Sequence, residues 1–140
     1  MNDRIQVMKI VNCRSQTRLF NIVENWAKKN LLISCDAQLT RDLQNREMLG
    51  LTMIAEKIAL PHVKTNYVQH NCVLVTQLDQ PIIWSTGYQV SIVIFLLVNQ
   101  VDEFVNRLMT ELADESVLEQ LENVNYSTEE IEKLLKEGEM

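Results

Sequence analysis

The sequence predicts an α/β domain, in which a mixed β-sheet of four to five strands is flanked by helices. Apolar residues make up 46% of the 140 residues, which is enough to bury a core and excludes intrinsic disorder. Three Gly and two Pro are fewer than a turn-rich all-β fold needs. Helical and strand periodicities both occur, and no repeat or linker divides the chain. Residues 1–140 are therefore expected to form one domain.

An amphipathic helix of about four turns is expected near the start of the chain. Ser15 and Thr17 are its candidate N-caps, and it ends near Asn30. Its apolar face consists of residues spaced i, i+3, i+4 and i+7, namely Leu19, Ile22, Val23 and Trp26.

A second helix is expected to start around Asp36. Leu39 and Leu43 lie on one face, and Arg46 continues that stripe, which predicts an inward-pointing arginine. Gly50 is placed to adopt the left-handed conformation that often ends a helix.

Extended segments are expected from Ile58 onward. Ile58–His62 is short, and Pro61 forbids its continuation as a central strand, so the chain must turn or reach a sheet edge at His62. Val90–Val98 is almost wholly apolar and β-branched, as expected of a central strand covered on both faces.

A hairpin is expected between these two segments. Cys72–Leu78 is its first strand, Asp79–Pro81 its turn and Ile82–Trp84 its short return strand.

Three helices are expected after the central strand. The first has the apolar stripe Phe104, Val105, Leu108, Met109 and Leu112, and the second has Val117, Leu118 and Leu121. A capping box of Ser127 and Glu130 opens the third, which buries Ile131, Leu134 and Leu135.

Charge and hydropathy exclude several partners. The net charge is −6 and the basic residues are scattered, so nucleic acid is not expected to bind. The longest apolar run, Ile92–Val98, is far shorter than the roughly 20 residues of a membrane span, and charges interrupt the N-terminus where a signal peptide would be apolar. We therefore expect no membrane insertion.

The cysteines and histidines predict neither a disulfide framework nor a metal site. Cys13, Cys35 and Cys72 are odd in number and lack C-x-x-C spacing, which suits a reducing cytoplasm. His62, His70 and Cys72 lack the spacing of zinc ligands. No glycine-rich phosphate loop is present, so neither ATP nor another cofactor is expected.

The segment Arg46–His62 is similar to the phosphorylation-site segment of fructose/mannitol-type IIA domains of the bacterial phosphoenolpyruvate-dependent sugar phosphotransferase system (PTS). It has Arg46-Glu47, then Thr52, and closes on Ile58-Ala59-Leu60-Pro61-His62 without a gap in the spacing. The resemblance extends through Pro81–Trp84 and the apolar strand to Asp114–Leu118, and thus covers most of the chain.

This resemblance implies that His62 accepts a phosphoryl group on Nε2 from the phosphohistidine of the carrier protein HPr and passes it to a IIB domain. Neutral imidazole is nucleophilic near pH 7 and needs no metal. Arg46 would make charge-assisted bonds to the phosphoryl oxygens, and Thr52 would offer its hydroxyl. The structural alternatives are a surface histidine, an arginine that only complements a helix dipole, and a turn threonine.

The chain also departs from the family pattern. Val63 replaces the usual small residue after the histidine, and Leu51, Ala55 and Lys57 occupy other positions that are usually small. A second histidine, which many members carry after the long strand, is absent where this chain has Gln100 or Val101, and sequence position does not make His70 its substitute. Three hypotheses remain: a transport phosphocarrier, a regulatory IIA-like domain as in sugar-operon regulators, and an interaction module that has lost phosphorylation.

Overall fold

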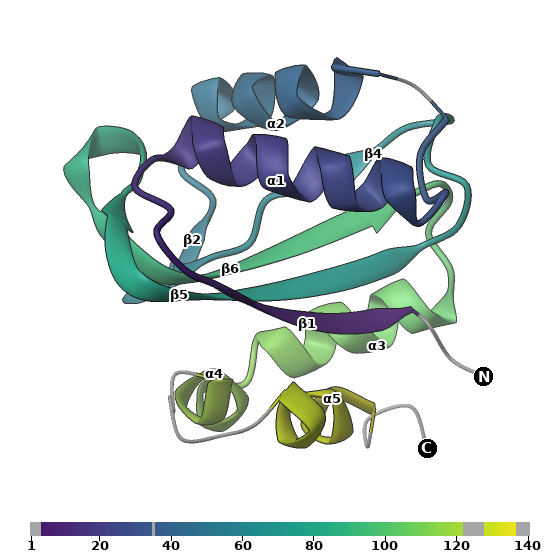
Figure 1. Ribbon diagram of the computed structural model, residues 1–140. Helices are drawn as coiled ribbons and strands as arrows, with labels where there is room; N and C mark the ends of the chain where they lie inside the picture. The colour runs from purple at the N-terminus through teal and green to yellow at the C-terminus, as the bar shows by residue number, and fades with distance from the viewer. Residues whose placement is uncertain (1–3, 35, 122–127, 137–140) are drawn as a thin grey trace.

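The computed structural model describes residues 4–34, 36–121 and 128–136. The chain order is β1 (Ile5–Ile10), α1 (Gln16–Lys29), α2 (Gln38–Leu49), β2 (Met53–Ala55), β3 (Lys57–Ala59), β4 (His62–Lys64), β5 (Cys72–Ile83), η1 (Ser85–Gly87), β6 (Gln89–Val98), α3 (Glu103–Leu112), α4 (Glu115–Leu121) and α5 (Thr128–Lys136). Helices α1 and α2 cover one face of the sheet and α3, α4 and α5 the other (Figure 1). The predicted fold class is confirmed, and the described residues contain the five expected helices.

The described strands number six and form one mixed sheet, so the expectation of four to five is corrected. Their order is β1-β5-β6-β3-β2, and β4 also pairs with β6. β5 and β6 are antiparallel, β1 joins β5 in parallel, and β3 and β4 both pair in parallel with β6. The periodicity does not predict β1, because a half-buried edge strand of six residues alternates irregularly.

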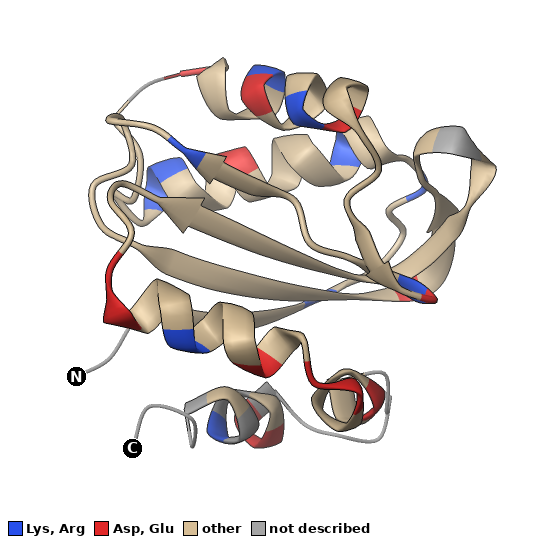
Figure 2. Ribbon diagram, turned by 180° about the vertical axis from the view of Figure 1, so that it is seen from behind, with Lys and Arg blue, Asp and Glu red and all other residues tan. Residues whose placement is uncertain are grey.

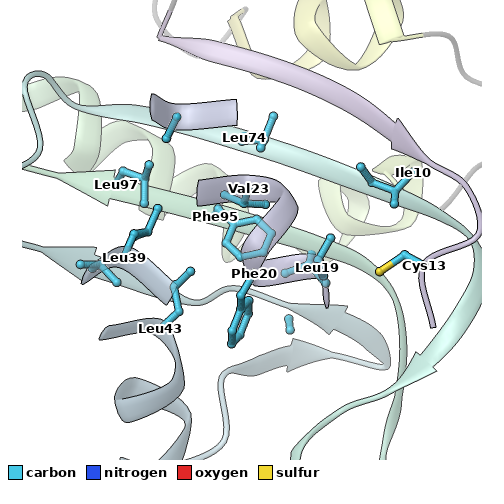
Figure 3. Packing of buried hydrophobic residues seen from close by; sticks show 14 of the residues in the cluster. Ile10, Cys13, Leu19, Phe20, Val23, Leu39, Leu43, Leu74, Phe95 and Leu97 are labelled. Carbon is cyan, nitrogen blue, oxygen red and sulfur yellow. The ribbon is translucent and has the colours of Figure 1, made fainter. Parts of the chain in front are cut away.

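The core has two layers, which meet at β6. Alternate side chains of β6 point to opposite faces, so Val93, Phe95 and Leu97 pack against the α1–α2 layer. Ile92, Ile94 and Leu96 pack against the α3–α5 layer. Figure 3 shows Phe20 of α1 directed at Phe95, with ring centroids 5.9 Å apart. The prediction that Val90–Val98 is a central strand covered on both faces is confirmed.

The predicted turn at Asp79–Pro81 is wrong. β5 runs on to Ile83, and its register against β6 shifts between Gln77 and Ile82. Such a bulge leaves residues unpaired and tolerates a proline that cannot donate to the ladder. The hairpin turns instead at η1, where Gly87 has φ +85°.

The predicted limits of α1 and the end of α2 at Gly50 are confirmed, whereas the start of α2 and the conformation of Gly50 are corrected. Ser15 caps α1 by accepting a hydrogen bond from the Arg18 amide at 3.1 Å. α2 begins at Gln38 because Ala37, with φ 63°, still has a left-handed backbone. Gly50 is extended rather than left-handed, since it leads directly into β2.

The third C-terminal helix buries Ile131 and Leu135 as expected, but Ser127 of the predicted capping box and the side chain of Leu134 lie outside the described residues. Met109 of α3 is 43% exposed and does not belong to the buried stripe. Its position one turn from Leu112 is at the margin of the apolar face.

Candidate functional site

His62 opens β4, at the edge of the sheet. It pairs with Leu96 of β6, and the part of the chain that the structure describes gives β4 no second strand partner. The side chain of Val63 is buried in the α1–α2 layer, whereas that of His62 is exposed. Of the two expected outcomes after Pro61, a turn or a sheet edge, the structure has the edge.

Pro61 lies between β3 and β4, which follow one another along the same side of β6. It cannot donate a hydrogen bond, but its carbonyl accepts one from the Leu96 amide at 3.1 Å. Strand pairing with β6 is thus interrupted at Leu60 and Pro61 and starts again at His62. The restricted backbone of Pro61 fixes the chain just before His62.

The environment of His62 favours the neutral imidazole. Partial burial lowers its pKa, and the positive charge of Arg46 lowers it further. The structure therefore brings His62 and Arg46 together, although 16 positions separate them in the sequence. A neutral imidazole at pH 7 keeps a lone pair available for nucleophilic attack.

Arg46 lies in the last turn of α2 and is half-buried, as the stripe of Leu39 and Leu43 predicts. Its Nη1 donates to the carbonyl of Gly50 at 3.2 Å. A guanidinium has five N–H donors in a fixed fork, so this bond leaves donors that can face an anion beside His62.

Thr52 is buried, and its hydroxyl takes part in a small polar cluster rather than facing solvent. The hydroxyl donates to Oε1 of Glu47. Trp84 Nε1 donates to the same Oε1 at 3.1 Å and to Thr52 Oγ1 at 3.2 Å. We refer to Glu47, Thr52 and Trp84 as the Glu47 cluster.

Glu47 is a residue to which the sequence analysis assigns no role. It is buried, four positions after Leu43 and eight after Leu39, so it continues their stripe one position beyond Arg46. The i, i+4, i+8 spacing is the signal that could have identified it, but a glutamate on an apolar stripe is ordinarily taken to be solvated.

His70 and Gln100 do not lie beside His62. His70 is exposed and precedes β5, which β6 separates from β4. Gln100 and Val101 are exposed and follow Val98, whose partner in β4 is Lys64 rather than His62.

The described residues offer no suitable arrangement for cysteine catalysis or for metal binding. Cys13 and Cys72 are buried free thiols, and burial raises the pKa of Cys72 to about 12; Cys35 lies outside the described residues. Among the described residues no group of His, Cys, Asp and Glu could hold a metal ion. No described helix has the length and hydropathy to cross a bilayer. Lys and Arg are spread over both helical layers, as Figure 2 shows.

The site is an exposed surface rather than an enclosed pocket. A cleft of about 1220 Å³ opens on the α3–α4 side of the sheet, and its lining includes Ile58 and Leu60 but not His62. His62 is exposed outside this cleft.

The comparisons with known proteins agree with this geometry. Residues 2–138 match the family described as "Phosphoenolpyruvate-dependent sugar phosphotransferase system, EIIA 2". The chain belongs to this family, whose members are phosphotransferase components. No curated protein matches the sequence.

Solved structures share the fold. The nitrogen regulatory protein IIA-Ntr from Neisseria meningitidis is 25% identical, with a TM-score of 0.73 and coverage of 94% of this chain and 92% of that one. The mannitol-specific cryptic enzyme IIA CmtB from Escherichia coli is 15% identical, with a TM-score of 0.74 and the same coverages. Enzyme IIAMTL from Escherichia coli, solved with phosphorylated IIBMTL, is 20% identical, with a TM-score of 0.67 and coverages of 93% and 94%.

Proposed function

We propose that residues 1–140 form a cytoplasmic phosphohistidine carrier of the phosphoenolpyruvate-dependent sugar phosphotransferase system. His62 accepts the phosphoryl group from HPr and passes it to a IIB domain. The observation that carries this proposal is an exposed, Pro-preceded histidine whose pKa is lowered beside Arg46, in a chain of the EIIA 2 family. Enzyme IIAMTL, solved with phosphorylated IIBMTL, supports the choice of a IIB domain as acceptor.

The transfer exchanges one nitrogen–phosphorus bond for another. The Nε2 lone pair of neutral His62 attacks the phosphorus of phosphohistidine in HPr, and the N–P bond to HPr breaks as its imidazole leaves with the electron pair. Arg46 stabilises the negative charge on the equatorial oxygens while the phosphoryl group is in flight. In the second step a cysteine thiolate of the IIB domain attacks, and the His62–phosphorus bond breaks in turn.

Intact mass after incubation with phosphoenolpyruvate, enzyme I and HPr tests the assignment. We expect the gain of one phosphoryl group that is acid-labile and alkali-stable, as a phosphoramidate is. His62→Ala should abolish the gain, and the matched variant His70→Ala should keep it. Label that persists in His62→Ala, or that is found on His70, would show that the acceptor is wrong.

A second candidate function is a regulatory IIA-like domain, in which phosphorylation of His62 controls contacts with other proteins. The similarity to a nitrogen regulatory protein IIA-Ntr favours it, and so does the absence of a second histidine at Gln100 or Val101. Onward transfer separates the two functions. Rapid loss of label to a IIB domain supports transport, whereas a stable phosphohistidine in the presence of IIB supports regulation.

A further inference from the structure

The phosphoryl-transfer scheme does not use the Glu47 cluster, although Glu47 directly follows Arg46 in the last turn of α2. Its members come from the end of α2, the residue before β2 and the residue after β5. All three are buried, with exposed fractions of 8% for Glu47, 4% for Thr52 and 2% for Trp84. The end of α2 and the start of β2 are thus tied to Trp84, which is distant in sequence, by side-chain hydrogen bonds in a buried environment.

Stability does not account for this cluster. Among the residues that the structure describes, the buried Oε2 of Glu47 has no hydrogen-bond partner. A buried carboxylate oxygen without a partner carries an uncompensated desolvation cost, and an apolar residue of similar volume would fill the same space without it. Unlike an apolar residue, the Glu47 carboxylate accepts directional hydrogen bonds. These bonds fix the orientation of both the Thr52 and the Trp84 side chains.

The cluster is connected to both residues of the site. On one side, the Arg46 guanidinium rests on the carbonyl of Gly50, and the Gly50 amide donates to the Glu47 carbonyl at 3.3 Å. The segment between Glu47 and Thr52 therefore holds the Arg46 guanidinium. The hydrogen bond between the Glu47 and Thr52 side chains joins the two ends of this segment.

On the other side, the Thr52 carbonyl accepts a hydrogen bond from the Leu60 amide at 2.9 Å. Leu60 is two residues before His62, and Pro61 between them restricts the backbone. Thr52 thus holds the segment that presents His62, while its hydroxyl holds the segment that supports Arg46.

We propose that Glu47, Thr52 and Trp84 are positioning residues that set the Arg46 guanidinium against the His62 imidazole before a phosphoryl group arrives. The inference rests on the proposed function of His62. It gives Thr52 an indirect role, through Glu47, in place of direct contact with the phosphoryl oxygens.

Two uncharged substitutions test the proposal in the full chain: Thr52→Val, which removes the hydroxyl, and Trp84→Phe, which removes the indole N–H. Loss of either bond should let Arg46 move away, so the His62 pKa should rise, as is also expected in Arg46→Met. An NMR titration of ¹⁵N-histidine-labelled protein measures this. The buried Thr76, whose hydroxyl donates to the Val93 carbonyl at 2.8 Å, provides the control Thr76→Val, which should leave the His62 pKa unchanged.

A charge effect can be told from a positioning effect by its sign. Removing the negative charge in Glu47→Gln would by itself lower the His62 pKa, because a nearby carboxylate favours the imidazolium. If the cluster positions Arg46, the pKa should rise instead. Thr52→Ser, which restores the hydroxyl, should return the pKa to that of the parent chain.

A double variant tests the route. In the Arg46→Met background, Thr52→Val should cause no additional rise of the His62 pKa. An additional rise would show that the cluster acts on His62 without Arg46 and would overturn the proposal. So would an unchanged His62 pKa in folded Trp84→Phe, a variant that keeps an aromatic ring beside Phe20 and carries the test even if Thr52→Val does not fold.

The kinetic readout is separate from the titration. Thr52→Val and Trp84→Phe should slow phosphoryl acceptance from phospho-HPr by roughly tenfold to a hundredfold, as expected for a misplaced stabilising group. If the parent chain accepts no phosphoryl group while the pKa changes occur, the proposed function fails and the positioning stands. If the parent chain is phosphorylated and neither variant changes rate or pKa, the positioning fails and the function stands.

Discussion

Helices α2 and α3 are capped differently at their N-termini. The difference affects how α2, the helix that carries Arg46, is held in place. α3 is capped locally: Asp102, the residue before it, accepts a hydrogen bond from the Val105 amide at 3.0 Å. α2 has no side-chain cap of its own. Instead Glu24 of α1, which is buried, accepts hydrogen bonds from the Ala37 and Thr40 amides at 2.9 and 2.8 Å.

The other ends differ in the same way. α3 closes through backbone bonds from Ala113, whereas the last turn of α2 contains Glu47, whose side chain is bonded to Thr52 before β2 and to Trp84 after β5. α2 is thus held at both ends by buried carboxylates that contact other elements. Such contacts fix a helix relative to its surroundings, which a local cap cannot do, and α2 is the helix that carries Arg46.

The largest expected difference between the two helices concerns their arginines. Arg46→Met should slow phosphoryl acceptance by on the order of 10²-fold, because it removes charge stabilisation of the moving phosphoryl group. The matched change in α3, Arg107→Met, loses an exposed ion pair with Glu103 and should leave the rate unchanged. Rates from rapid-quench transfer with phospho-HPr check both. Equal rates in the two variants would show that Arg46 does not supply the charge that stabilises the phosphoryl group.

The cap of α2 should matter more for stability than that of α3. Glu24→Ala leaves two backbone amides at the start of α2 without their acceptor in a buried position, and we expect a loss of about 2 kcal/mol in the free energy of unfolding. Urea denaturation followed by circular dichroism measures it. A loss below that of Asp102→Ala would contradict the comparison.

Asp102→Ala should cost about 1 kcal/mol by the same measurement, the ordinary effect of a lost N-cap. Asp102 also forms an ion pair with Arg4 at 2.7 Å, but both side chains are more than one-third exposed, so solvent screens this pair. Asp102→Asn, which keeps the cap and removes the charge, is the control and should lie between the parent chain and Asp102→Ala.

The smallest effect is the pH dependence that His62 gives to stability. Its folded pKa lies below the unfolded value of about 6.5, so the unfolded chain binds the proton first as the pH falls. The free energy of unfolding should therefore decrease from about pH 6.5 down through the folded pKa and not change above it. The difference between the parent chain and His62→Gln isolates this contribution. A difference that grows on the alkaline side would mean that the pKa is raised.

Elements with strong local signals were predictable. The limits of α1 follow from Ser15 and Asn30, and the central position of β6 follows from an apolar, β-branched run. The turn predicted at Pro81 was wrong, because the sequence around a proline in a bulge looks the same as the sequence around a proline in a turn. Gly50 misled in the same way, because its extended backbone is set by the strand that follows.

The sequence by itself determined the α/β class and both helical layers, and the family segment that contains Arg46 and His62 predicted that they share a site. The tertiary structure decided the sixth strand, the capping of α2 by Glu24, and the burial of Glu47 with Thr52 and Trp84. The physical reason is the separation in sequence over which each interaction acts. Periodicity and local caps act over three to seven residues, whereas Glu24 and Glu47 bind partners as far as 16 and 37 positions away, which have no local pattern.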